Sequence, residues 1–443
     1  MLSSHFSQTL SLYISPKSEL VVAFSGGVDS VVLLHLAAYY SKLHQLPCVA
    51  VYVNHGLSEH AVEWEVFCQS YCDSLGISLF IERVNLDIGP QQSLEEVARE
   101  ARYDVLAKHI NNHSLLLTGQ HQDDQVETFF LALKRGSGPA GLSSMPVIAP
   151  FVTGRKCRPL LSTSRCDIEA YANVNQLKWV EDESNKDTRF DRNFLRHKVT
   201  PLLRQRWPSF ASAVNRSAQL CAEQEQLLTE LLQPKVKAYQ NTIQGISIEL
   251  LALESEAACK VILRLWLKQF SILLPTQAQL GVLWNEVANA QQDANPCLEI
   301  NSIQLRRFQG YLYCLPQYGD VSQWNSELKE ILTLPDGLGN IELKQTLGAN
   351  DSDLMPLFLR SPLSGERVTV RFDSTGLIAH PETRQHSRKM KKLYQEYGIP
   401  SWQRTRLPLI FYNDQLAAVT GLFVCKAFSG KECELIWHKS GSI

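Results

Sequence analysis

The stretch Ser25-Gly26-Gly27-Val28-Asp29-Ser30 lies between the short apolar run Val21–Phe24 and a helical pattern over Val31–Leu43. Its two consecutive glycines let the backbone turn sharply, so that its N–H groups can approach an anion closely. The N-terminus of the following helix adds a favourable dipole, and the two serine hydroxyl groups add hydrogen-bond donors. A strand, this loop and a helix in succession therefore predict a turn that binds the phosphates of a nucleotide.

Asp29 is the unusual member of this loop. A carboxylate beside phosphate groups is unfavourable unless a cation lies between them, so the sequence predicts Mg²⁺ at Asp29. The alternative is an ordinary turn rich in serine and glycine, in which Asp29 caps the helix. No G-x-x-x-x-G-K-[ST] sequence occurs in the chain, which disfavours a phosphoryl transferase of the Walker type. We expect ATP and Mg²⁺ as ligands, with these nucleotide-binding residues: Ser25, Gly26, Gly27, Val28, Asp29 and Ser30.

Outward from the loop, short β-branched runs alternate with helical patterns between Leu20 and Glu127. Ser93 and Glu96 form a capping box at the start of the third helix. This alternation predicts an α/β fold with a doubly wound parallel sheet, whose ligands bind outside the C-terminal ends of the strands. The expected strands are Val21–Phe24, Val49–Val53, Ile77–Val84 and Leu115–Thr118, and the expected helices are Val31–Leu43, Ala61–Leu75 and Leu94–Asn111.

The segment Thr118–Thr128 follows the fourth predicted strand and combines carboxylates with a histidine. If a helix begins near Asp123, the side chains of Asp124 and Glu127 share one face. Two carboxylates beside His121 suit the binding of a metal ion or of a polar, cationic substrate. The alternative is that Asp123 and Asp124 cap the helix while Glu127 is solvated.

Two further polar sites are expected near the same edge of the sheet. His55 follows the second strand and could contact adenine or the substrate, although a turn histidine beside a glycine is often structural. Arg99 and Arg102 lie three residues apart on one predicted helix, so they either face phosphate or pair with Glu95 and Glu96 at the surface. Both alternatives stay open at each site.

The composition is that of an ordinary globular protein. The chain has 443 residues, enough for roughly three domains, with 44% hydrophobic residues and a net charge of −2. Eleven cysteines without any C-x-x-C pair indicate reduced thiols, which predicts a cytoplasmic protein. The N-terminal residues do not fit a signal peptide, and no apolar run reaches the ~20 residues of a membrane span. We therefore expect no membrane partner.

Because the net charge is close to zero, a nucleic-acid surface must come from a local cluster. Residues 384–406 hold seven Lys or Arg against one acid, Glu396, in what reads as one strongly basic helix. A basic helix with an aromatic residue suits contact with an RNA backbone, whereas the alternative is a solvated helix face. The residues expected to contact RNA are Arg384, Arg388, Lys389, Lys391, Lys392, Trp402 and Arg404.

The loop at residues 25–30 resembles that of the N-type ATP pyrophosphatases, the PP-loop superfamily, whose members cleave ATP between the α- and β-phosphates and adenylate a substrate oxygen. Over the first 210 or so residues, the chain is similar to the tRNA(Ile)-lysidine synthase family. The stretches that carry this resemblance are Leu133–Leu142, Arg158–Leu161, Val180–Asn185 and Arg192–His197. The basic stretch at residues 384–406 resembles the family's C-terminal tRNA-binding domain.

The resemblance implies roles for residues that the motifs contain. ATP binding falls on the loop, and catalytic or substrate roles fall on Asp124 and Glu127, while some relatives have His where Gln120 stands. Together with the residues singled out above, the expected catalytic residues are Asp29, Asp124 and Glu127, and His55 is expected to bind ATP. The expected substrate-binding residues are Arg99, Arg102, His121, Arg192 and Arg196.

The resemblance also implies a reaction and partners. The C2 oxygen of the wobble cytidine in a CAU-anticodon tRNA(Ile) attacks the α-phosphate of ATP, and free L-lysine then displaces AMP to form lysidine. Carboxylates at the site would orient the lysine ammonium group and accept its proton. The oligomeric state stays open, with a homodimer among the options.

Two other classes of function compete with this one. A tRNA thiolase or an amidotransferase could use the same scaffold, but thiolases usually need paired cysteines, and glutamine-dependent synthetases need a glutaminase domain. A tRNA-binding module with a vestigial nucleotide loop is disfavoured because both the loop and the acidic block are intact.

Shifts in composition predict the organisation of the chain. We expect a PP-loop ATP pyrophosphatase catalytic domain over residues 1–212 and a helical linker over residues 213–245. A mainly helical middle domain that binds substrate or tRNA follows over residues 246–330. Residues 318–352, rich in Gly, Asp and Asn, suggest a linker or edge hairpins before a small α+β tRNA-binding domain over residues 353–443.

Overall fold

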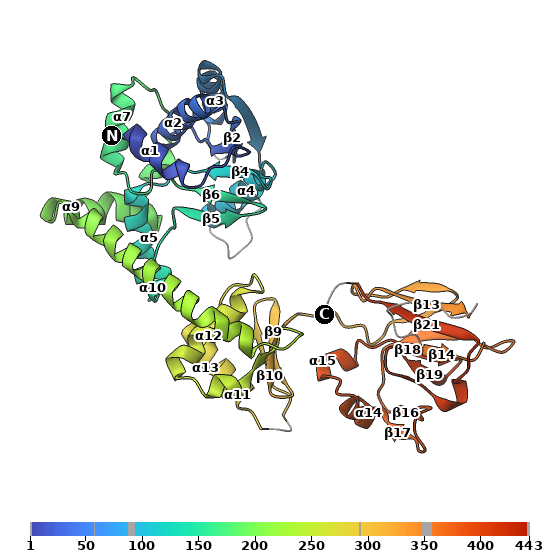
Figure 1. Ribbon diagram of the computed structural model, residues 1–443. Helices are drawn as coiled ribbons and strands as arrows, with labels where there is room; N and C mark the ends of the chain where they lie inside the picture. Colours follow the sequence, from blue (N-terminus) through green and yellow to red (C-terminus); the bar gives the residue numbers. More distant parts are fainter. Residues whose placement is uncertain (1, 57, 87–93, 292–293, 347–356, 441–443) are drawn as a thin grey trace. The chain divides into compact units, whose positions relative to one another are not determined.

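The computed structural model describes residues 2–56, 58–86, 94–291, 294–346 and 357–440. The chain forms two compact units, Met1–Leu228 and Thr229–Ile443 (Figure 1). No helix in the described part of the chain is long and apolar enough to cross a membrane.

A six-stranded sheet forms the centre of the first unit, in the order β3-β2-β1-β4-β6-β5. Every neighbouring pair is parallel except β5 and β6, which form an antiparallel hairpin at one edge. The four predicted strands are confirmed to within two residues at each end, whereas the hairpin was not predicted. The strands are β1 (Glu19–Ala23), β2 (Cys48–Asn54), β3 (Ser78–Arg83), β4 (Ser114–Leu117), β5 (Ile148–Phe151) and β6 (Gly154–Cys157).

Helices cover both faces of this sheet, as a doubly wound fold requires. Leu20 and Val22 of β1 belong to the larger core, beneath helices α1, α2, α3 and α7. Val21 points to the opposite face and packs with Leu106 near the end of α4. This alternation follows from the two-residue repeat of a strand. The helices are α1 (Leu2–Ser11), α2 (Val28–His44), α3 (Ala61–Leu75), α4 (Leu94–Ala107), α5 (Gln122–Lys134), α6 (Pro139–Leu142) and α7 (Arg165–Val174).

Three of these helices were predicted from the sequence. α3 has the predicted limits, α2 begins at the glycine loop, and α4 ends four residues early. The predicted cap residue of α4, Ser93, lies outside the described residues.

A series of short helical segments follows α7, and two of them, α8 and η2, contact α5. The series comprises the 3₁₀ turn η1 (Glu183–Lys186), α8 (Asp191–Phe194), the π-turn η2 (Leu195–Val199) and α9 (Thr200–Arg206). The long helix α10 (Phe210–Tyr239) follows, and together with α9 it confirms the helical character predicted for residues 201–240. Its first turns pack Ala211 and Val214 against Val126 of α5, which fixes α5 beside η2.

The middle segment combines helices with an antiparallel sheet. Trp266 and Leu280 lie in its core, as the sequence predicts. Its helical elements are α11 (Ile248–Ala252), α12 (Glu256–Lys268), α13 (Gln277–Val282) and η3 (Leu283–Ala288). The sheet has the order β7-β10-β9-β8, with β7 (Ile246–Ser247), β8 (Cys297–Ile300), β9 (Ile303–Phe308) and β10 (Tyr311–Pro316). This sheet was not expected from the sequence.

The C-terminal segment packs two antiparallel sheets around one core. The first, in the order β11-β15-β18-β19-β20, contains β11 (Asn325–Glu327), β15 (Val368–Arg371), β18 (Leu409–Tyr412), β19 (Gln415–Val419) and β20 (Phe423–Val424). The second, in the order β12-β13-β21-β14, contains β12 (Ile331–Thr333), β13 (Asn340–Gln345), β14 (Leu357–Leu359) and β21 (Cys433–His438). β11, β12 and β13 thus lie within the stretch for which the sequence suggested a linker or edge hairpins. β12 and β13 form an antiparallel hairpin at the edge of the second sheet, so the hairpin alternative is confirmed there and the linker alternative is wrong.

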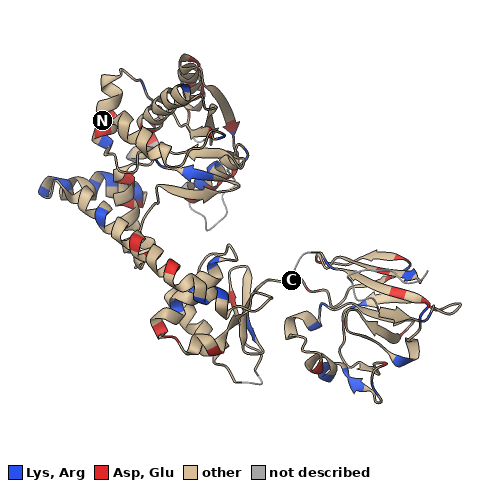
Figure 2. Ribbon diagram, viewed as in Figure 1, with Lys and Arg blue, Asp and Glu red and all other residues tan. Residues whose placement is uncertain are grey.

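The basic stretch does not form the single helix predicted for it. It contains β17 (Arg388–Lys389), paired with β16 (Ile378–Ala379), and then α14 (Met390–Glu396) and α15 (Ser401–Arg404) (Figure 2). Gly398, with a φ of +66°, and Pro400 separate the two helices. A left-handed glycine followed closely by proline ends a helix, which is why the basic pattern is broken.

Candidate active site and nucleic-acid interface

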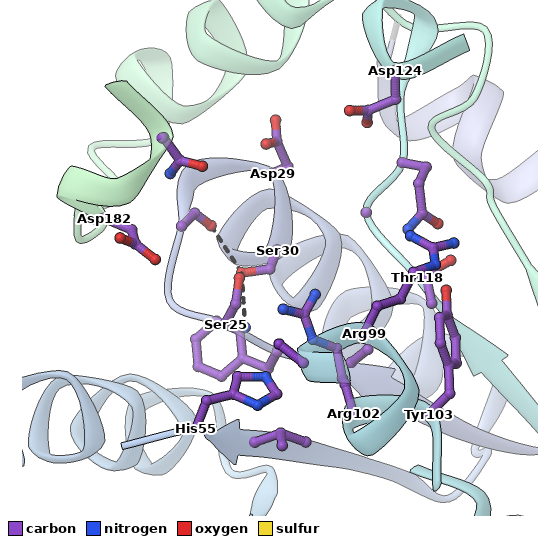
Figure 3. Close-up of a pocket in the computed structure, with 18 of the residues that line it drawn as sticks. Ser25, Asp29, Ser30, His55, Arg99, Arg102, Tyr103, Thr118, Asp124 and Asp182 are labelled. Carbon is purple, nitrogen blue, oxygen red and sulfur yellow. Dashed lines mark hydrogen bonds between the residues drawn. The ribbon is translucent and has the colours of Figure 1, made fainter. Parts of the chain in front are cut away.

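A cavity of about 490 Å³ lies at the C-terminal ends of the parallel strands. The loop after β1, the ends of β2 and β4, and helix α4 contribute to its walls (Figure 3). The switch-point rule predicts a ligand at this position, because strand order reverses beside β1. Its polar lining includes Ser25, Asp29, Ser30, His55, Arg99, Arg102, Thr118, Gln120, Asp124, Asp182, Asn185, Arg192, Asn193 and Arg196.

The glycine loop has a conformation that only glycine allows at one position. Gly26 has a φ of +79°, and a Cβ atom there would lie 2.8 Å from Val180 Cγ2. The backbone N–H of Val180 donates to the carbonyl of Gly26, which holds the loop against the segment after α7. The hydroxyl group of Ser30 donates to the carbonyl of Gly27 at 2.9 Å. Among the described residues no side chain caps α2, so its first-turn N–H groups remain available to an anion.

The end of β4 touches the first turn of α2. A Cβ atom at Gly119 would lie 3.3 Å from the backbone carbonyl of Asp29, so glycine lets these two segments approach closely. This contact places the acidic block beside the glycine loop. The two motifs that stand out in the sequence therefore share one wall of the cavity.

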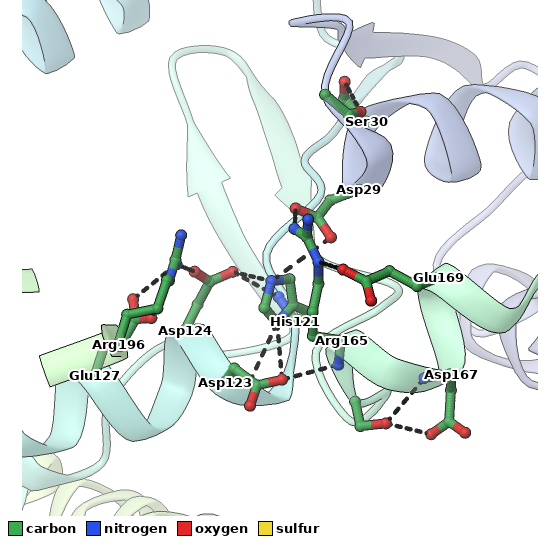
Figure 4. A network of polar contacts seen from close by, with 12 residues as sticks. Asp29, Ser30, His121, Asp123, Asp124, Glu127, Arg165, Asp167, Glu169 and Arg196 are labelled. Atoms are coloured by element: carbon green, nitrogen blue, oxygen red, sulfur yellow. Dashed lines mark hydrogen bonds and ion pairs between the residues drawn. The ribbon is translucent and has the colours of Figure 1, made fainter. Parts of the chain in front are cut away.

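Asp29 is held by two basic side chains. Arg165 Nη1 lies 2.6 Å from Oδ2 of Asp29, and His121 Nε2 lies 3.6 Å from its Oδ1 (Figure 4). Burial raises the pKa of the Asp29 carboxyl, while His121 and Arg165 oppose that rise. Arg165 also pairs with Glu169 one turn along α7. Sequence reasoning missed Arg165, because no motif marks it and α7 brings it to the site from far along the chain.

Asp124 and Glu127 form a compact cluster with two arginines. Arg192 Nε and Arg196 Nε each lie 2.6 Å from a carboxylate oxygen of Glu127. The Nη2 atoms of both arginines lie 3.0 Å from Oδ1 of Asp124. The pKa of Asp124 is lowered: burial alone would raise it, but His121 and Arg192 outweigh that effect. Two carboxylates and two guanidinium groups thus neutralise one another in the cavity wall.

The structure separates these residues by their access to the cavity. Asp124, Arg192 and Arg196 line it, whereas the side chains of Glu127 and His121 lie behind the wall, with 1% and 2% of each residue exposed. Direct contact of His121 or Glu127 with a substrate, as predicted, does not fit this placement. Their polar atoms instead contact residues that line the cavity, so they can hold those residues in position.

Asp123 and Asp124 have different partners although they are neighbours. Asp123 accepts the backbone N–H of Arg165 at 2.8 Å and forms an ion pair with Arg204 of α9. Asp123 therefore ties α5 to α7 and α9 and does not line the cavity. Of the alternatives that the sequence left open, helix capping is confirmed for Asp124, which also lines the cavity. Glu127 is buried, so the alternative that it is solvated is wrong.

His55 lines the cavity with both ring nitrogens buried and without a hydrogen-bond partner among the described residues. Burial, assisted by the charge of Arg102, lowers the pKa of His55 to about 4, so the ring is neutral near pH 7. A neutral imidazole presents one donor and one acceptor. This pairing matches the edge of a purine base.

Arg99 and Arg102 lie on the side of α4 that faces the cavity. The Arg99 guanidinium lies 5.3 Å from the ring centre of Tyr103, and Lys156 lies 4.2 Å from the same centre. The side chain of Glu95, one of the alternative partners that the sequence offered, lies outside the described residues. The two arginines put positive charge on the cavity wall, where an anionic ligand would meet it.

In the basic stretch at residues 384–406, some side chains are exposed and others pair with neighbouring groups. Lys389, Lys391 and Lys392 are exposed. Arg384 lies 2.5 Å from Glu396, Arg388 lies 3.9 Å from the same carboxylate, and Arg404 Nε donates to the carbonyl of Ile399. The exposed lysines are the members of this set with the freest access to a phosphate backbone.

Trp402 differs from the lysines because its ring is buried. It packs in an aromatic cluster with Phe308 and Tyr313, with ring centres 5.9 and 5.5 Å away. The ring faces used by these contacts are not available for stacking on a base. Its predicted contact with RNA does not fit this environment.

Three family models match the chain. They are a PP-loop domain over residues 2–203, a TilS substrate binding domain over residues 246–313 and a TilS substrate C-terminal domain over residues 368–439. Curated relatives match along nearly the whole length. The tRNA(Ile)-lysidine synthase of Vibrio vulnificus (strain CMCP6) is 51% identical over 99% of both chains. That of Photobacterium profundum is 47% identical over 99% of both chains. With this identity over its full length and a PP-loop cavity lined by the motif residues, the chain belongs to the tRNA(Ile)-lysidine synthase family.

Proposed function

We propose that this enzyme joins L-lysine to C2 of the wobble cytidine in the CAU-anticodon tRNA(Ile), with ATP converted to AMP and diphosphate. The observation that carries the proposal is one cavity in which the glycine loop, Asp29 and Asp124 meet. The product, lysidine, changes the codon read from AUG to AUA and the tRNA identity from methionine to isoleucine. We propose that the reaction takes place in the cytoplasm.

The glycine loop is proposed to bind the triphosphate of ATP. Its N–H groups and the guanidinium groups of Arg99 and Arg102 supply donors and positive charge around the cavity. The hydroxyl groups of Ser25 and Ser30 hydrogen-bond within the loop and hold its shape. The neutral ring of His55 is proposed to contact the adenine edge, since both its nitrogens lack a protein partner in the described residues.

Asp29 is proposed to hold Mg²⁺. It lines the cavity, and its Oδ1 atom has no hydrogen-bond partner in the described part of the chain, so lone pairs remain for a hard cation. A bound magnesium ion would compensate the charge of the departing diphosphate. Arg165 steadies the other oxygen of the same carboxylate.

The first step is adenylation. The C2 oxygen of cytidine attacks the α-phosphate of ATP, the bond between the α-phosphate and the bridging oxygen breaks, and diphosphate leaves. Arg192 and Arg196 line the cavity and are held in place by Glu127, so they can stabilise negative charge that develops on the phosphates. Glu127 acts through these two arginines.

The second step is displacement of AMP. The ε-amine of lysine attacks C2, the bond from C2 to the AMP oxygen breaks, and the amine loses a proton. Asp124 is the carboxylate of the acidic block that lines the cavity, so it is proposed to orient the lysine ammonium and accept the proton.

The second unit is proposed to bind the tRNA. The exposed lysines at positions 389, 391 and 392 are its proposed phosphate contacts. We keep residues 1–212, 213–245, 246–330 and 353–443 as proposed functional segments, and a homodimer stays a prediction.

The main competing function is tRNA thiolation. Cys68 lies against Gly26 of the glycine loop, and both Cys68 and Cys72 are buried. Burial raises the pKa of the Cys72 thiol to about 12. A thiol in that environment is a poor nucleophile. The geometry therefore favours amine transfer over sulfur transfer.

One assay distinguishes these functions. The enzyme is incubated with ATP, radiolabelled lysine and transcripts of tRNA(Ile) with a CAU anticodon, and with the same tRNA carrying a UAU anticodon as control. We expect label to enter only the CAU transcript, together with AMP release. ATP cleavage without lysine incorporation, or sulfur incorporation from a sulfide donor, would overturn the proposal.

A further inference from the structure

His121 lies between two of the carboxylates that line the cavity, those of Asp29 and Asp124. Its Nε2 atom is 3.6 Å from Oδ1 of Asp29 and 3.5 Å from Oδ2 of Asp124, and only 2% of the residue is exposed (Figure 4). One of these carboxylates belongs to the glycine loop and the other to α5. The imidazole therefore bridges the two motifs from behind the cavity wall.

The backbone fixes the orientation of this ring and the position of its proton. The N–H of Asp123 donates to Nδ1 of His121 at 3.2 Å, so Nδ1 is an acceptor. In a neutral imidazole the proton then resides on Nε2, which faces both carboxylates. The N–H of His121 itself donates to Oδ2 of Asp124 at 2.9 Å, which completes a capping box at the start of α5.

The remaining oxygens of the two carboxylates are occupied by arginines. Arg165 contacts Oδ2 of Asp29, and Arg192 and Arg196 contact Oδ1 of Asp124. Each carboxylate is thus held from outside by guanidinium, and one oxygen of each lies 3.5–3.6 Å from the same Nε2 atom, an electrostatic contact that is longer than a hydrogen bond. A donor in that position draws the two negatively charged groups together, where otherwise they would repel each other.

We infer that His121 is a positioning residue whose Nε2–H sets the spacing between Asp29 of the glycine loop and Asp124 of α5. This inference rests on the proposed function, in which Asp29 serves the nucleotide and Asp124 serves the lysine. ATP and lysine must both reach the same cytidine. The distance between the carboxylates of Asp29 and Asp124 therefore determines the geometry of both chemical steps. A misplacement of about 1 Å at such a site can cost on the order of 100-fold in rate.

Two substitutions separate the bridge from the helix cap. In His121→Asn, the amide oxygen can take the place of Nδ1 and accept the N–H of Asp123, but nothing reaches the position of Nε2. In His121→Gln, the longer amide can place a donor near the position of Nε2, while the cap is lost. The exposed His113 supplies a control, His113→Asn, that is expected to leave activity unchanged.

The kinetic test compares kcat, KM and thermal unfolding for these variants. We expect His121→Asn to unfold near the wild-type temperature, with kcat about 100-fold lower and the KM for ATP changed less than a few fold. His121→Gln is expected to unfold at a lower temperature yet to recover about 10-fold of the lost kcat. A fully active Asn variant, or losses of kcat that follow unfolding temperature in both variants, would overturn the inference.

A second measurement does not depend on the reaction. In protein labelled with ¹⁵N-histidine and free of substrates, the signals absent from His121→Asn identify His121, and we expect its Nδ1 to be unprotonated and its Nε2 protonated. The opposite tautomer would overturn the inference whether or not the enzyme makes lysidine. If the expected tautomer is found but wild-type enzyme incorporates no lysine, the proposed function fails while the bridge stands.

Discussion

Charged residues are arranged differently in the cavity wall of the first unit and in the basic stretch of the second. Asp124 and Glu127 are buried and each is contacted by both Arg192 and Arg196, whereas the lysines at 389, 391 and 392 extend into solvent. Removing one member of a buried cluster leaves an uncompensated charge, which costs about 3–5 kcal/mol. An exposed lysine contributes little alone and acts on RNA through additive release of counterions. We therefore expect a single substitution in the cavity wall to have a large effect. In the basic stretch, we expect the effect on RNA affinity to grow with the number of lysines replaced.

The largest effect is expected for Glu127→Ala. It removes one of the two carboxylates that neutralise Arg192 and Arg196, which leaves an excess positive charge in the cavity wall. We therefore expect lysine incorporation to fall by at least about 10³-fold and the free energy of unfolding to fall by about 3–5 kcal/mol. Retention of tRNA on a filter should persist. Glu223→Ala, at an exposed position on α10, is the matched control. Equal effects of the two substitutions would show that buried and exposed charges do not differ in the way proposed.

Asp29→Ala should separate chemistry from stability. Its side chain is 27% exposed, so we expect a smaller loss of stability than for Glu127→Ala. Lysine incorporation and tRNA-dependent exchange of ATP with pyrophosphate should both fall by about 10²–10³-fold, with tRNA retention largely intact. Loss of tRNA binding in this variant would contradict the role assigned to Asp29.

The basic stretch should respond in proportion to the charges removed. The triple substitution of Lys389, Lys391 and Lys392 by Gln is expected to lower tRNA affinity by about 10-fold. The slope of log K against log salt should become shallower by roughly 2–3, because each phosphate contact contributes about 0.7–0.9. Single substitutions should give about a third of this change. An unchanged slope, with Lys42→Gln on α2 as control, would place the RNA contacts elsewhere.

Trp402→Ala should have the smallest effect on the salt dependence. Because the ring packs against Phe308 and Tyr313, we expect a loss of about 3–5 kcal/mol in stability and a slope equal to that of wild type. Urea unfolding and filter binding check the two halves of this expectation. A flattened slope with unchanged stability would instead show that the ring contacts RNA.

The sequence predicted best where local chemistry dictates structure. Patterns within a few residues were enough to predict the alternation of strands and helices and the glycine loop. They also predicted that Asp124 and Glu127 lie on the same face of one helix. It predicted least well where partners come from distant segments. Arg165 reaches Asp29 from a helix more than a hundred residues away, and the short strands at 297–316 and 325–345 depend on cross-strand pairs that no local window reveals.

The amino-acid sequence by itself determined the parallel sheet, the glycine loop after its first strand and the residue types of the acidic block, because periodicity and glycine conformations are local properties of a chain. Only the tertiary structure decided that Asp124 reaches the cavity while Glu127 and His121 lie behind its wall, and that Trp402 is buried while the lysines beside it are exposed. The physical reason is burial. Whether a side chain meets solvent, a ligand or another charge depends on which distant segments fold against it.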